Sequence, residues 1–270
     1  MRIDLHLHST ASDGSLSPSA LMWAARAGGL DIIALSDHDT CDGLEEALRS
    51  LPDQLHVIPA IELSTHNDGN EQHILGYFID HRHESIRRYA EGAVEKRRDR
   101  IVRMIDKLAT CGIRLSLEDV IANAEPGTRM LGRPHLARAL VRRGSVNSVG
   151  EAFERFIGDA GPAYLPTQLL TPQEAIRLIH EIGGVAIWAH PRLNAVERYL
   201  DSFMAWGIDG VECFRPAATP AEALQLEQVA CARSLLVAGG SDWHGTWQGR
   251  LGDFYVNHDE VEKLLEVGGI

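Results

Sequence analysis

The chain begins with an alternation of apolar and polar positions that is typical of a β-strand over residues 2–8. Ile3, Leu5 and Leu7 are apolar, and the positions that alternate with them include His6 and His8. Because successive side chains of a strand point to opposite faces, the two imidazoles are expected to share one face and the three apolar side chains the other. The pattern therefore predicts a strand that presents two potential metal ligands together at its end.

Short apolar runs and helical segments then alternate along the first third of the chain. Ser17 is a favourable N-cap, Pro18 suits the first helical position, and the Gly28-Gly29 pair ends the helix. The other elements expected here are strands over 32–35, 56–63 and 74–79 and a helix over 44–50. Strand-helix repeats of this length predict an α/β fold with parallel pairing of the strands.

Helix-forming residues predominate between residues 85 and 161, where no convincing strand occurs. A long charged helix is expected to end near Leu108, and Ser116 and Asp119 have the spacing of a capping box. Two further helical stretches are expected around 134–141 and 149–157. We interpret this part as a helical insertion, which divides the chain into a first barrel part (1–84), an insertion domain (85–162) and a second barrel part (163–270).

The basic run Lys96-Arg97-Arg98 lies on the long helix of this insertion. Acidic residues are interspersed with it, among them Glu95 and Asp99. Mixed charges of this kind are typical of a solvated helix face, so the run is not expected to be a binding surface.

The alternating pattern resumes after Pro166. Two helices are expected to begin with capping boxes, Thr171 to Glu174 and Thr219 to Glu222. The strands expected in this part cover 185–188, 210–214 and 235–238. The whole chain therefore reads as one α/β barrel-like unit interrupted by helices.

Composition and charge exclude several classes of protein. A net charge of -12 and a pI near 5.5 argue against a broad basic surface that binds duplex DNA through its phosphates. The four cysteines form no CxxC pair, which argues against a zinc ribbon or a disulfide framework. Neither a signal peptide nor a long apolar run is visible, so we expect a cytoplasmic, monomeric protein without membrane contact.

Side chains that bind metals follow most of the expected strands. Besides His6 and His8, they are Asp13, Asp37, His38, Asp39, Glu62, His73, His190, Asp242 and His244. An isolated HxH pair is as compatible with two surface histidines as with a metal site, but repeated placement at strand ends favours ligands. Carboxylates and imidazoles gathered at the carboxyl ends of strands predict a multinuclear metal site.

These motifs resemble those of the polymerase and histidinol phosphatase (PHP) family of metal-dependent phosphoesterases. The resemblance rests on the HxH pair, Ser12-Asp13-Gly14, Ser36-Asp37-His38-Asp39, Glu62, His190-Pro191 and Ser241-Asp242-Trp243-His244, and it spans nearly the whole chain. It implies a distorted (β/α)7 barrel with two or three metal ions. Residues 132–135 and 161–166 resemble the branch that acts on nucleoside 3′,5′-bisphosphates and short oligonucleotides.

The resemblance also implies how the ligands are shared among the metal ions. The first ion would be held by His6, His8, Glu62 and Asp242, the second by Glu62, His73 and His190, and the third by Asp13, His38 and His244. Many family members have a histidine at the position of Asp13, so the third site departs from the pattern. Mn²⁺ is the ion that the family favours, and the mixed ligand set also suits Fe²⁺ or Zn²⁺.

Such a centre predicts hydrolysis by a metal-activated hydroxide that attacks a phosphoryl group in line with the leaving oxygen. The third ion, His38 or His244 would assist the leaving alkoxide. Asp37 and Asp39 could orient histidine rings, or each could simply form a turn. The catalytic candidates are therefore His38, His244 and Asp37.

Selectivity for a second phosphate requires cations outside the metal centre. Arg133 and His135 are the candidates for the terminal 5′-phosphate, because a guanidinium presents paired donors to phosphate oxygens. Arg133 could instead only anchor the helix that begins at Pro134, and Arg192 is a weaker candidate.

We therefore expect a phosphoesterase that converts pAp to AMP and phosphate and trims short 5′-phosphorylated oligoribonucleotides. The alternatives are a histidinol-phosphate phosphatase, which needs a pocket for a small cationic amine, and a non-catalytic metal-stabilised module. The insertion with Arg133 argues against the first alternative, and the intact motif positions argue against the second.

Overall fold

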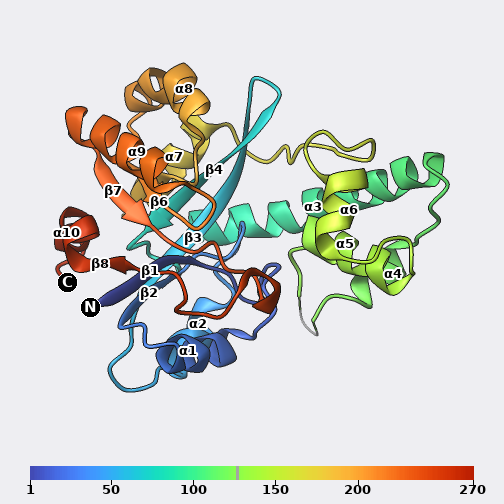
Figure 1. Ribbon diagram of the computed structural model, residues 1–270, viewed down its shortest axis with the longest axis horizontal. Helices are drawn as coiled ribbons and strands as arrows, with labels where there is room; N and C mark the ends of the chain where they lie inside the picture. The colour runs from blue at the N-terminus through green and yellow to red at the C-terminus, as the bar shows by residue number, and fades with distance from the viewer. Residues whose placement is uncertain (126–127) are drawn as a thin grey trace.

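The computed structural model describes residues 1–125 and 128–270, and its centre is a mixed eight-stranded sheet in the order β7-β6-β5-β4-β3-β2-β1-β8 (Figure 1). The strands are β1 (Arg2–Leu7), β2 (Ile32–Leu35), β3 (His56–Asn67), β4 (Asn70–Tyr77), β5 (Val185–Trp188), β6 (Gly210–Phe214), β7 (Leu236–Gly239) and β8 (Val256–Asn257). The sheet curls into a nearly closed barrel, which confirms the expected α/β fold of the PHP type.

The two ends of the sheet approach each other just after β1 and β7. The amide of His8 donates to the carbonyl of Trp243 at 3.1 Å, and Leu7 forms an isolated bridge with Trp243. Gly240 permits this approach, because a Cβ at that position would lie 2.4 Å from the Cβ of His6. The strand ends that carry metal-type side chains are thereby brought together.

The expectation that the strands of the first third pair in parallel is wrong for β4. It pairs antiparallel with both β3 and β5, whereas β1, β2 and β3 pair in parallel. Asp68 and Gly69 have positive φ angles of 50° and 82° and turn the chain from β3 into β4. An Asp-Gly pair is a strong hairpin signal. His73 therefore lies within a strand rather than before one.

The alternation of the first strand is also interrupted. The register between β1 and β2 shifts between Asp4 and Leu7, as it does at a β-bulge. Ile3 and Leu5 belong to the core inside the barrel, but Leu7 packs with the helices that follow β1 and β2. The expectation that the three apolar side chains share one face is therefore wrong for Leu7.

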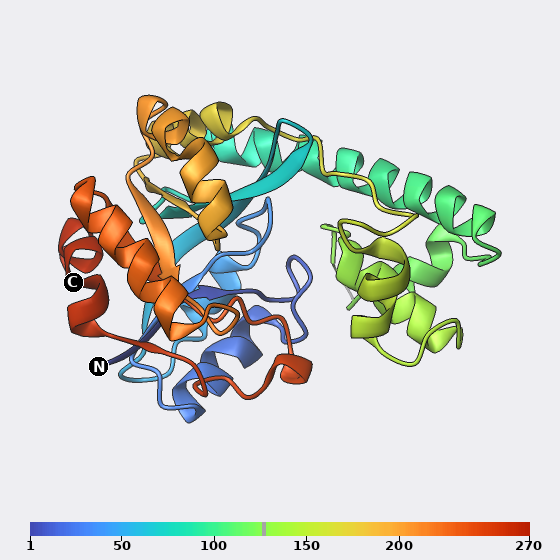
Figure 2. The ribbon, with the colours of Figure 1, turned by 45° about the horizontal axis from the view of Figure 1, so that its top comes forward.

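Helices cover the outside of the barrel (Figure 2). They are α1 (Pro18–Ala27), α2 (Leu44–Arg49), α7 (Pro172–Glu181), α8 (Leu193–Ala205), α9 (Pro220–Ala232) and α10 (His258–Val267). The capping boxes at Thr171 and Thr219 are confirmed: each hydroxyl accepts from the amide three residues later, and that residue's glutamate accepts from the cap amide. These reciprocal bonds fix where α7 and α9 begin.

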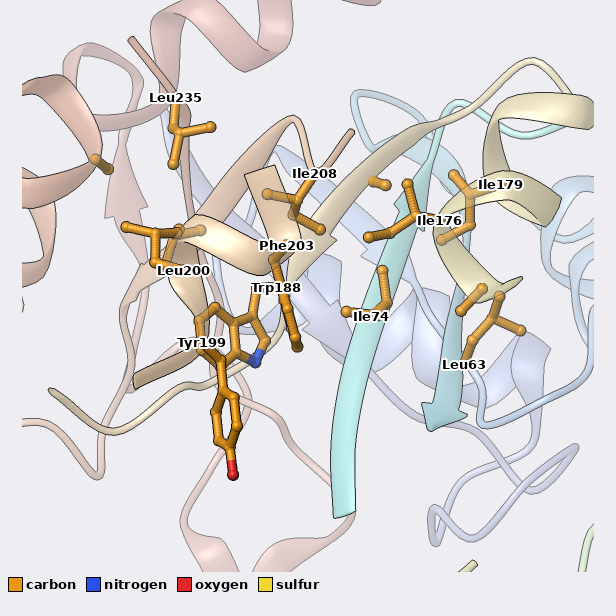
Figure 3. Packing of buried hydrophobic residues seen from close by; sticks show 14 of the residues in the cluster. Leu63, Ile74, Ile176, Ile179, Trp188, Tyr199, Leu200, Phe203, Ile208 and Leu235 are labelled. Carbon is orange, nitrogen blue, oxygen red and sulfur yellow. The ribbon is translucent and has the colours of Figure 1, made fainter. Parts of the chain in front are cut away.

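The largest apolar core lies between the sheet and α7, α8 and α9. Figure 3 shows Trp188 of β5 against Phe203 of α8, with ring centroids 4.4 Å apart, and Ile74 of β4 near Ile176 of α7. Burial of such large side chains contributes about 1.5–3 kcal/mol each relative to leaving them exposed. This packing holds β4 and β5, which deliver two of the candidate ligands.

The segment between β4 and α7 is helical, as expected, and extends to one side of the barrel (Figure 1). It contains α3 (Glu84–Thr110), α4 (Leu117–Ile121), α5 (Arg133–Arg142), α6 (Val149–Ala152) and a π-helix, η1 (Phe153–Ile157). Met104, Leu108, Leu136 and Leu140 belong to a separate buried cluster of this part. The exact boundaries at residues 85 and 162 stay a prediction.

Among the described residues, no helix combines the length and the apolar character that crossing a membrane requires.

Candidate metal centre

All the side chains expected to bind metal converge at one end of the barrel. His6 and His8 come from the end of β1, Glu62 from β3 and His73 from β4, and the others from loops that follow β1, β2, β5 and β7. The ring centroids of His8 and His244 are 4.0 Å apart, and those of His8 and His38 are 4.6 Å apart. Segments more than 200 residues apart in sequence thus form one cluster.

Three groups of side chains place their ligand atoms within 4.8 Å of one another. They are His6, His8, Glu62 and Asp242; His38, Glu62 and His73; and His8, Asp13, His38 and His244. The first group has the composition expected for the first ion. The second contains His38 where the family pattern implies His190, and the third adds His8 to the expected set.

Glu62 lies at the middle of the cluster. Its Oε1 is 2.8 Å from Nδ1 of His73 and 2.9 Å from Nε2 of His190, so His190 adjoins the second group. Its Oε2 is 3.2 Å from Nε2 of His6 and 2.9 Å from Nδ1 of His38. A carboxylate with ligand atoms near both of its oxygens would suit a bridge between two ions.

The other two carboxylates of the cluster each face imidazoles. Asp242 Oδ1 is 3.4 Å from Nε2 of His6 and 3.2 Å from Nε2 of His8. Asp13 Oδ1 is 3.2 Å from Nε2 of His244. The cluster thus combines nitrogen and carboxylate oxygen ligands around neighbouring points.

The donor set of this centre fits divalent transition-metal ions. Several of its buried nitrogen and oxygen atoms have no hydrogen-bond partner among the described residues: His6 Nε2, His8 Nε2, Asp13 Oδ1, His38 Nδ1, Glu62 Oε2 and His73 Nε2. Leaving such atoms unsatisfied costs about 1–3 kcal/mol each, so a folded protein rarely gathers them without a ligand. Imidazoles and carboxylates together suit Mn²⁺, Fe²⁺ or Zn²⁺.

The protonation states of the cluster follow from burial and neighbouring charges. Burial and the imidazoles of His244 and His38 lower the pKa of His8 to about 3, which keeps this ring neutral, as a metal ligand must be. Burial alone would raise the pKa of Glu62, but the imidazoles of His38 and His73 hold it well below its ordinary value. The central carboxylate is therefore ionised.

Glu212 of β6 is a buried partner of the cluster that the sequence analysis missed. Its Oε1 is 2.9 Å from Nδ1 of His6, and its Oε2 accepts from the amide of His190 at 2.6 Å. Carboxylates in this position fix the ring orientation of metal-binding histidines. A glutamate in the middle of the apolar run Val211-Glu212-Cys213 was the available sequence signal.

Asp4 of β1 ties the first strand to the loop after β7. It accepts a hydrogen bond from the amide of Ser241 at 2.8 Å, one residue before Asp242. Burial raises the pKa of Asp4 to about 6, although the bonds from Ser241 oppose the shift. This hydrogen bond therefore helps to keep Asp242 near His6 and His8.

The backbone is strained at two of the cluster residues. His190 and Asp242 have φ angles of 33° and 54°. Positive φ values are uncommon for residues with a side chain, and strain of this kind concentrates at functional sites, where the surrounding structure maintains it.

Of the two alternatives for Asp37 and Asp39, a hydrogen bond to a histidine ring is found for neither among the described residues. Asp37 accepts hydrogen bonds from Ser9 and Ser12 and so shapes the loop that carries Asp13. Asp39 accepts from Nε of Arg97 at 2.7 Å and from the amide of Ser64. Hydrogen bonds from other segments of the barrel and from Arg97 thus occupy the two carboxylates in place of an imidazole.

The expectation of a solvated basic run is wrong for Arg97, although Lys96 and Arg98 are exposed. Arg97 is 4% exposed and pairs with the buried Asp39 of the barrel. Only one of three successive helix positions faces the barrel, because each residue turns the helix by about 100°. Arg97 therefore fastens α3 to the loop that carries His38.

A cavity of about 480 Å³ lies between the metal cluster and the insertion. Asp13, His38, His73, His190, Asp242 and His244 line one side, and Arg97, Arg100, Arg133 and Phe153 line the other. Arg133 is 2.7 Å from Asp159 and 3.5 Å from Glu71, and its guanidinium lies 5.4 Å from the ring centroid of Tyr164. Arginines and metal ligands thus share one cavity.

The other two predicted substrate contacts lie elsewhere. His135 is 1% exposed, its Nδ1 accepts from the amide of Gly132, and burial lowers its pKa to about 4, so it is a neutral helix cap rather than a phosphate ligand. Arg192 lines a second cavity, on the other side of His190 and Asp242. Of the three predicted substrate contacts, only Arg133 therefore lines the cavity between the metal cluster and the insertion.

Six further histidines lie outside the three ligand groups. His81 is near Glu45, His83 caps α3, and His180 is 2.7 Å from Asp209. His56, His66 and His258 belong to none of the three ligand groups found among the described residues.

Comparison with known proteins agrees with this geometry. The model of the PHP domain matches residues 4–123. A 5′-3′ exoribonuclease from Haemophilus influenzae is 36% identical over 254 residues, which cover 90% of each protein. A 3′,5′-nucleoside bisphosphate phosphatase from Chromobacterium violaceum is 28% identical over 253 residues, covering 92% of this chain and 88% of that protein.

The fold agrees as well. A solved structure from Bifidobacterium adolescentis superposes with a TM-score of 0.86 at 31% identity and covers 97% of this chain and 95% of its own. The match to the domain model, the identity over nearly the full length and the cluster of buried metal ligands lead to one conclusion. The chain belongs to the PHP domain family and is a metal-dependent phosphoesterase.

Proposed function

We propose that this protein removes the 3′-phosphate of nucleoside 3′,5′-bisphosphates and trims short 5′-phosphorylated oligoribonucleotides from the 5′ end. The observation that carries this proposal is the shared cavity, in which the metal cluster faces Arg97, Arg100 and Arg133. Although the net charge of the protein is -12, three arginine side chains lie in this one cavity, which fits a substrate with a second anionic group. The names of the two relatives describe the same pair of reactions.

Arg133 is the proposed ligand of the 5′-phosphate. Its side chain is 19% exposed and opens on the cavity, and one of its partners, Asp159, is itself 77% exposed. A phosphate can replace that solvated partner, while Glu71 keeps the guanidinium in place from the other side. Phosphate recognition therefore needs little rearrangement of the arginine.

The proposed reaction takes place at the cluster around Glu62. Bound divalent ions, for which we propose Mn²⁺, would lower the pKa of a water molecule and neutralise charge on the phosphoryl oxygens. His6, His8, Glu62 and Asp242 would hold one of them. His38 and His244 also line the cavity, and whichever ring does not hold a metal ion can deliver a proton to the leaving 3′ oxygen.

The arginine side of the cavity favours this substrate over histidinol phosphate. Histidinol carries a cationic amine, which Arg100 and Arg133 would repel. Burial lowers the pKa of Arg100 only to about 10, so this group stays charged at neutral pH. The part of the substrate that contacts Arg100 and Arg133 is therefore expected to be anionic.

Steady-state kinetics of Arg133→Ala on pAp and on adenosine 3′-phosphate tests the proposal. A charge-assisted contact to phosphate is worth about 1.5–3 kcal/mol, so kcat/KM on pAp should fall roughly 10- to 150-fold. Adenosine 3′-phosphate lacks the contacted group and should react poorly with both proteins. Arg142→Ala, an exposed arginine of the same helix, is the matched control. Equal losses on both substrates would exclude Arg133 as the 5′-phosphate ligand.

A further inference from the structure

A second cavity, of about 1130 Å³, adjoins the metal cluster from the side opposite the insertion. Residues at the start of α8, in the loop between β6 and α9 and in the segment 241–254 line it. His190, Asp242 and Gln248 line both this cavity and the one that contains Arg133. A substrate bound at the metal cluster can therefore extend into both cavities.

Arg192, Arg215 and Arg250 line this second cavity, which we call the three-arginine cavity. In the described parts of the chain, no carboxylate lies within ion-pair distance of any of these guanidinium groups. Arg215 donates from Nη2 to the carbonyl of Pro191 at 2.8 Å, and its Nη1 is buried without a partner. The cavity thus offers cationic donors to an anion.

The acidic residues of the cavity wall form no ion pair with these arginines among the described residues, although the charge of Arg215 helps to lower the pKa of Glu222. Glu222 accepts from the amide of Thr219 and caps α9. Asp253 accepts from the backbone amide of Arg250 at 2.9 Å and so closes a turn. The third, Asp242, belongs to the metal cluster. Guanidinium N–H groups that are not in ion pairs therefore remain available to a ligand.

A longer substrate needs such a cavity for chemical reasons. In pAp the reacting phosphate ends the molecule, but in a strand one of its oxygens carries the next ribose. During hydrolysis the water oxygen bonds to phosphorus, the bond from phosphorus to O3′ of the first nucleotide breaks, and O3′ takes a proton. The phosphate stays on the 5′ end of the shortened strand. With the first nucleotide beside Arg133, the rest of the strand must leave the metal cluster by another side.

We propose that the three-arginine cavity binds the second and following nucleotides of a 5′-phosphorylated single-stranded oligonucleotide. This inference rests on the proposed function and adds a separate subsite to it. The arginines contact successive phosphates, and the partly buried ring of Phe254, which lines the same wall, offers a face on which a base can stack. Cationic donors combined with an aromatic face are the usual means of binding single strands.

Kinetics on substrates of two lengths tests this subsite. The variants are Arg250→Ala and the double variant Arg192→Ala/Arg250→Ala, and the control is Arg103→Ala, an exposed arginine of α3. For a 5′-phosphorylated pentaribonucleotide, KM should rise about 3- to 10-fold for each arginine removed, while pAp, which does not reach the cavity, should change less than about twofold. The slope of log KM against log salt concentration should become shallower by about 0.7 for each phosphate that a variant no longer binds.

The binding of an uncleavable pentanucleotide separates this inference from the proposed function. The first nucleotide of this probe carries a 2′-O-methyl group and its first linkage is a methylphosphonate, a fluorophore marks its 3′ end, and fluorescence anisotropy reports its affinity. Weaker binding by the double variant than by the control supports the subsite, even if wild type hydrolysed neither substrate and the proposed function failed. Unchanged pentanucleotide binding and KM in the double variant, or equal losses on pAp and the pentanucleotide, would overturn the subsite.

Discussion

The barrel end and the helical insertion face each other across one cavity, but they are built from opposite kinds of residue. The barrel contributes buried imidazoles and carboxylates such as His6 and Glu62, which attract cations. The insertion contributes arginines such as Arg133, which attract anions. The proposed substrate carries two phosphates, and across this cavity the metal ligands come from the barrel and the arginines from the insertion.

The two regions also hold their functional side chains differently. Glu62 and His73 lie in β3 and β4, and the continuous antiparallel pairing of these two strands fixes their positions. The arginines of the insertion are placed by ion pairs to the barrel, Arg97 to Asp39 and Arg100 to Glu71. Metal ligands need positions fixed within a fraction of an ångström, whereas long arginine side chains tolerate more variation.

The largest expected effect is the loss of the metal centre in Glu62→Ala. Because both carboxylate oxygens face imidazoles, the variant should lose bound metal and at least about 1000-fold in kcat on pAp. Inductively coupled plasma mass spectrometry and phosphate release measure the two quantities. Full metal content and normal turnover would show that Glu62 is not required for metal binding.

The second prediction concerns the link between the two regions. Arg97→Met leaves the carboxylate of Asp39, which is 0% exposed, without its cation, so the free energy of unfolding should fall by about 3–5 kcal/mol. Arg98→Met, on the exposed face of the same helix, should change it by less than about 0.5 kcal/mol. Urea denaturation measures both. Equal effects would show that α3 does not depend on a buried ion pair.

Local features of the fold and the site were predictable from the sequence. The HxH pair, the capping boxes at Thr171 and Thr219 and the helical character of 85–161 depend on residues close together in the chain. The hairpin at Asp68-Gly69 was equally local, but the strand-helix rhythm around it suggested parallel pairing. Local patterns therefore predicted the elements better than their pairing.

Contacts between distant residues could not be predicted in this way. Arg97 and Asp39 are 58 positions apart, and Glu212 and His6 are 206 apart. Arg97 lies four positions from both Ala93 and Ile101 and so falls on the buried face of α3, but nothing in the sequence identifies Asp39 as its partner. His135 likewise has the sequence context of a ligand and the surroundings of a helix cap.

The third prediction concerns the carboxylate that supports the His6 ring. In Glu212→Gln the side chain can no longer accept from both the His6 ring and the His190 amide, because one oxygen becomes an amide nitrogen. Loss of such a supporting carboxylate should weaken metal affinity about 10- to 100-fold. Metal titration measures the change, and circular dichroism should show an unaltered fold. An unchanged affinity would mean that the strand alone orients His6.

The smallest effects should come from two helix caps, one in each region. Thr171→Ala removes a cap of α7, whose Ile176 and Ile179 lie in the largest core, and should cost about 1 kcal/mol of global stability. Ser116→Ala removes the cap of the short α4 in the insertion and should destabilise that region only. Amide hydrogen exchange distinguishes global from local opening.

The pH dependence of the same two caps follows from their carboxylates. The backbone amides of Thr171 and Ser116 lower the pKa of Glu174 and Asp119, so each cap contributes stability above the carboxylate's unfolded pKa and loses it as the pH falls through the folded one. Acidification should therefore lower the protection factors, which correct for the slower intrinsic exchange of amides in acid, throughout the barrel helices through Glu174, but only near α4 through Asp119. Exchange that rises uniformly in Ser116→Ala would show that the insertion and the barrel unfold as one unit.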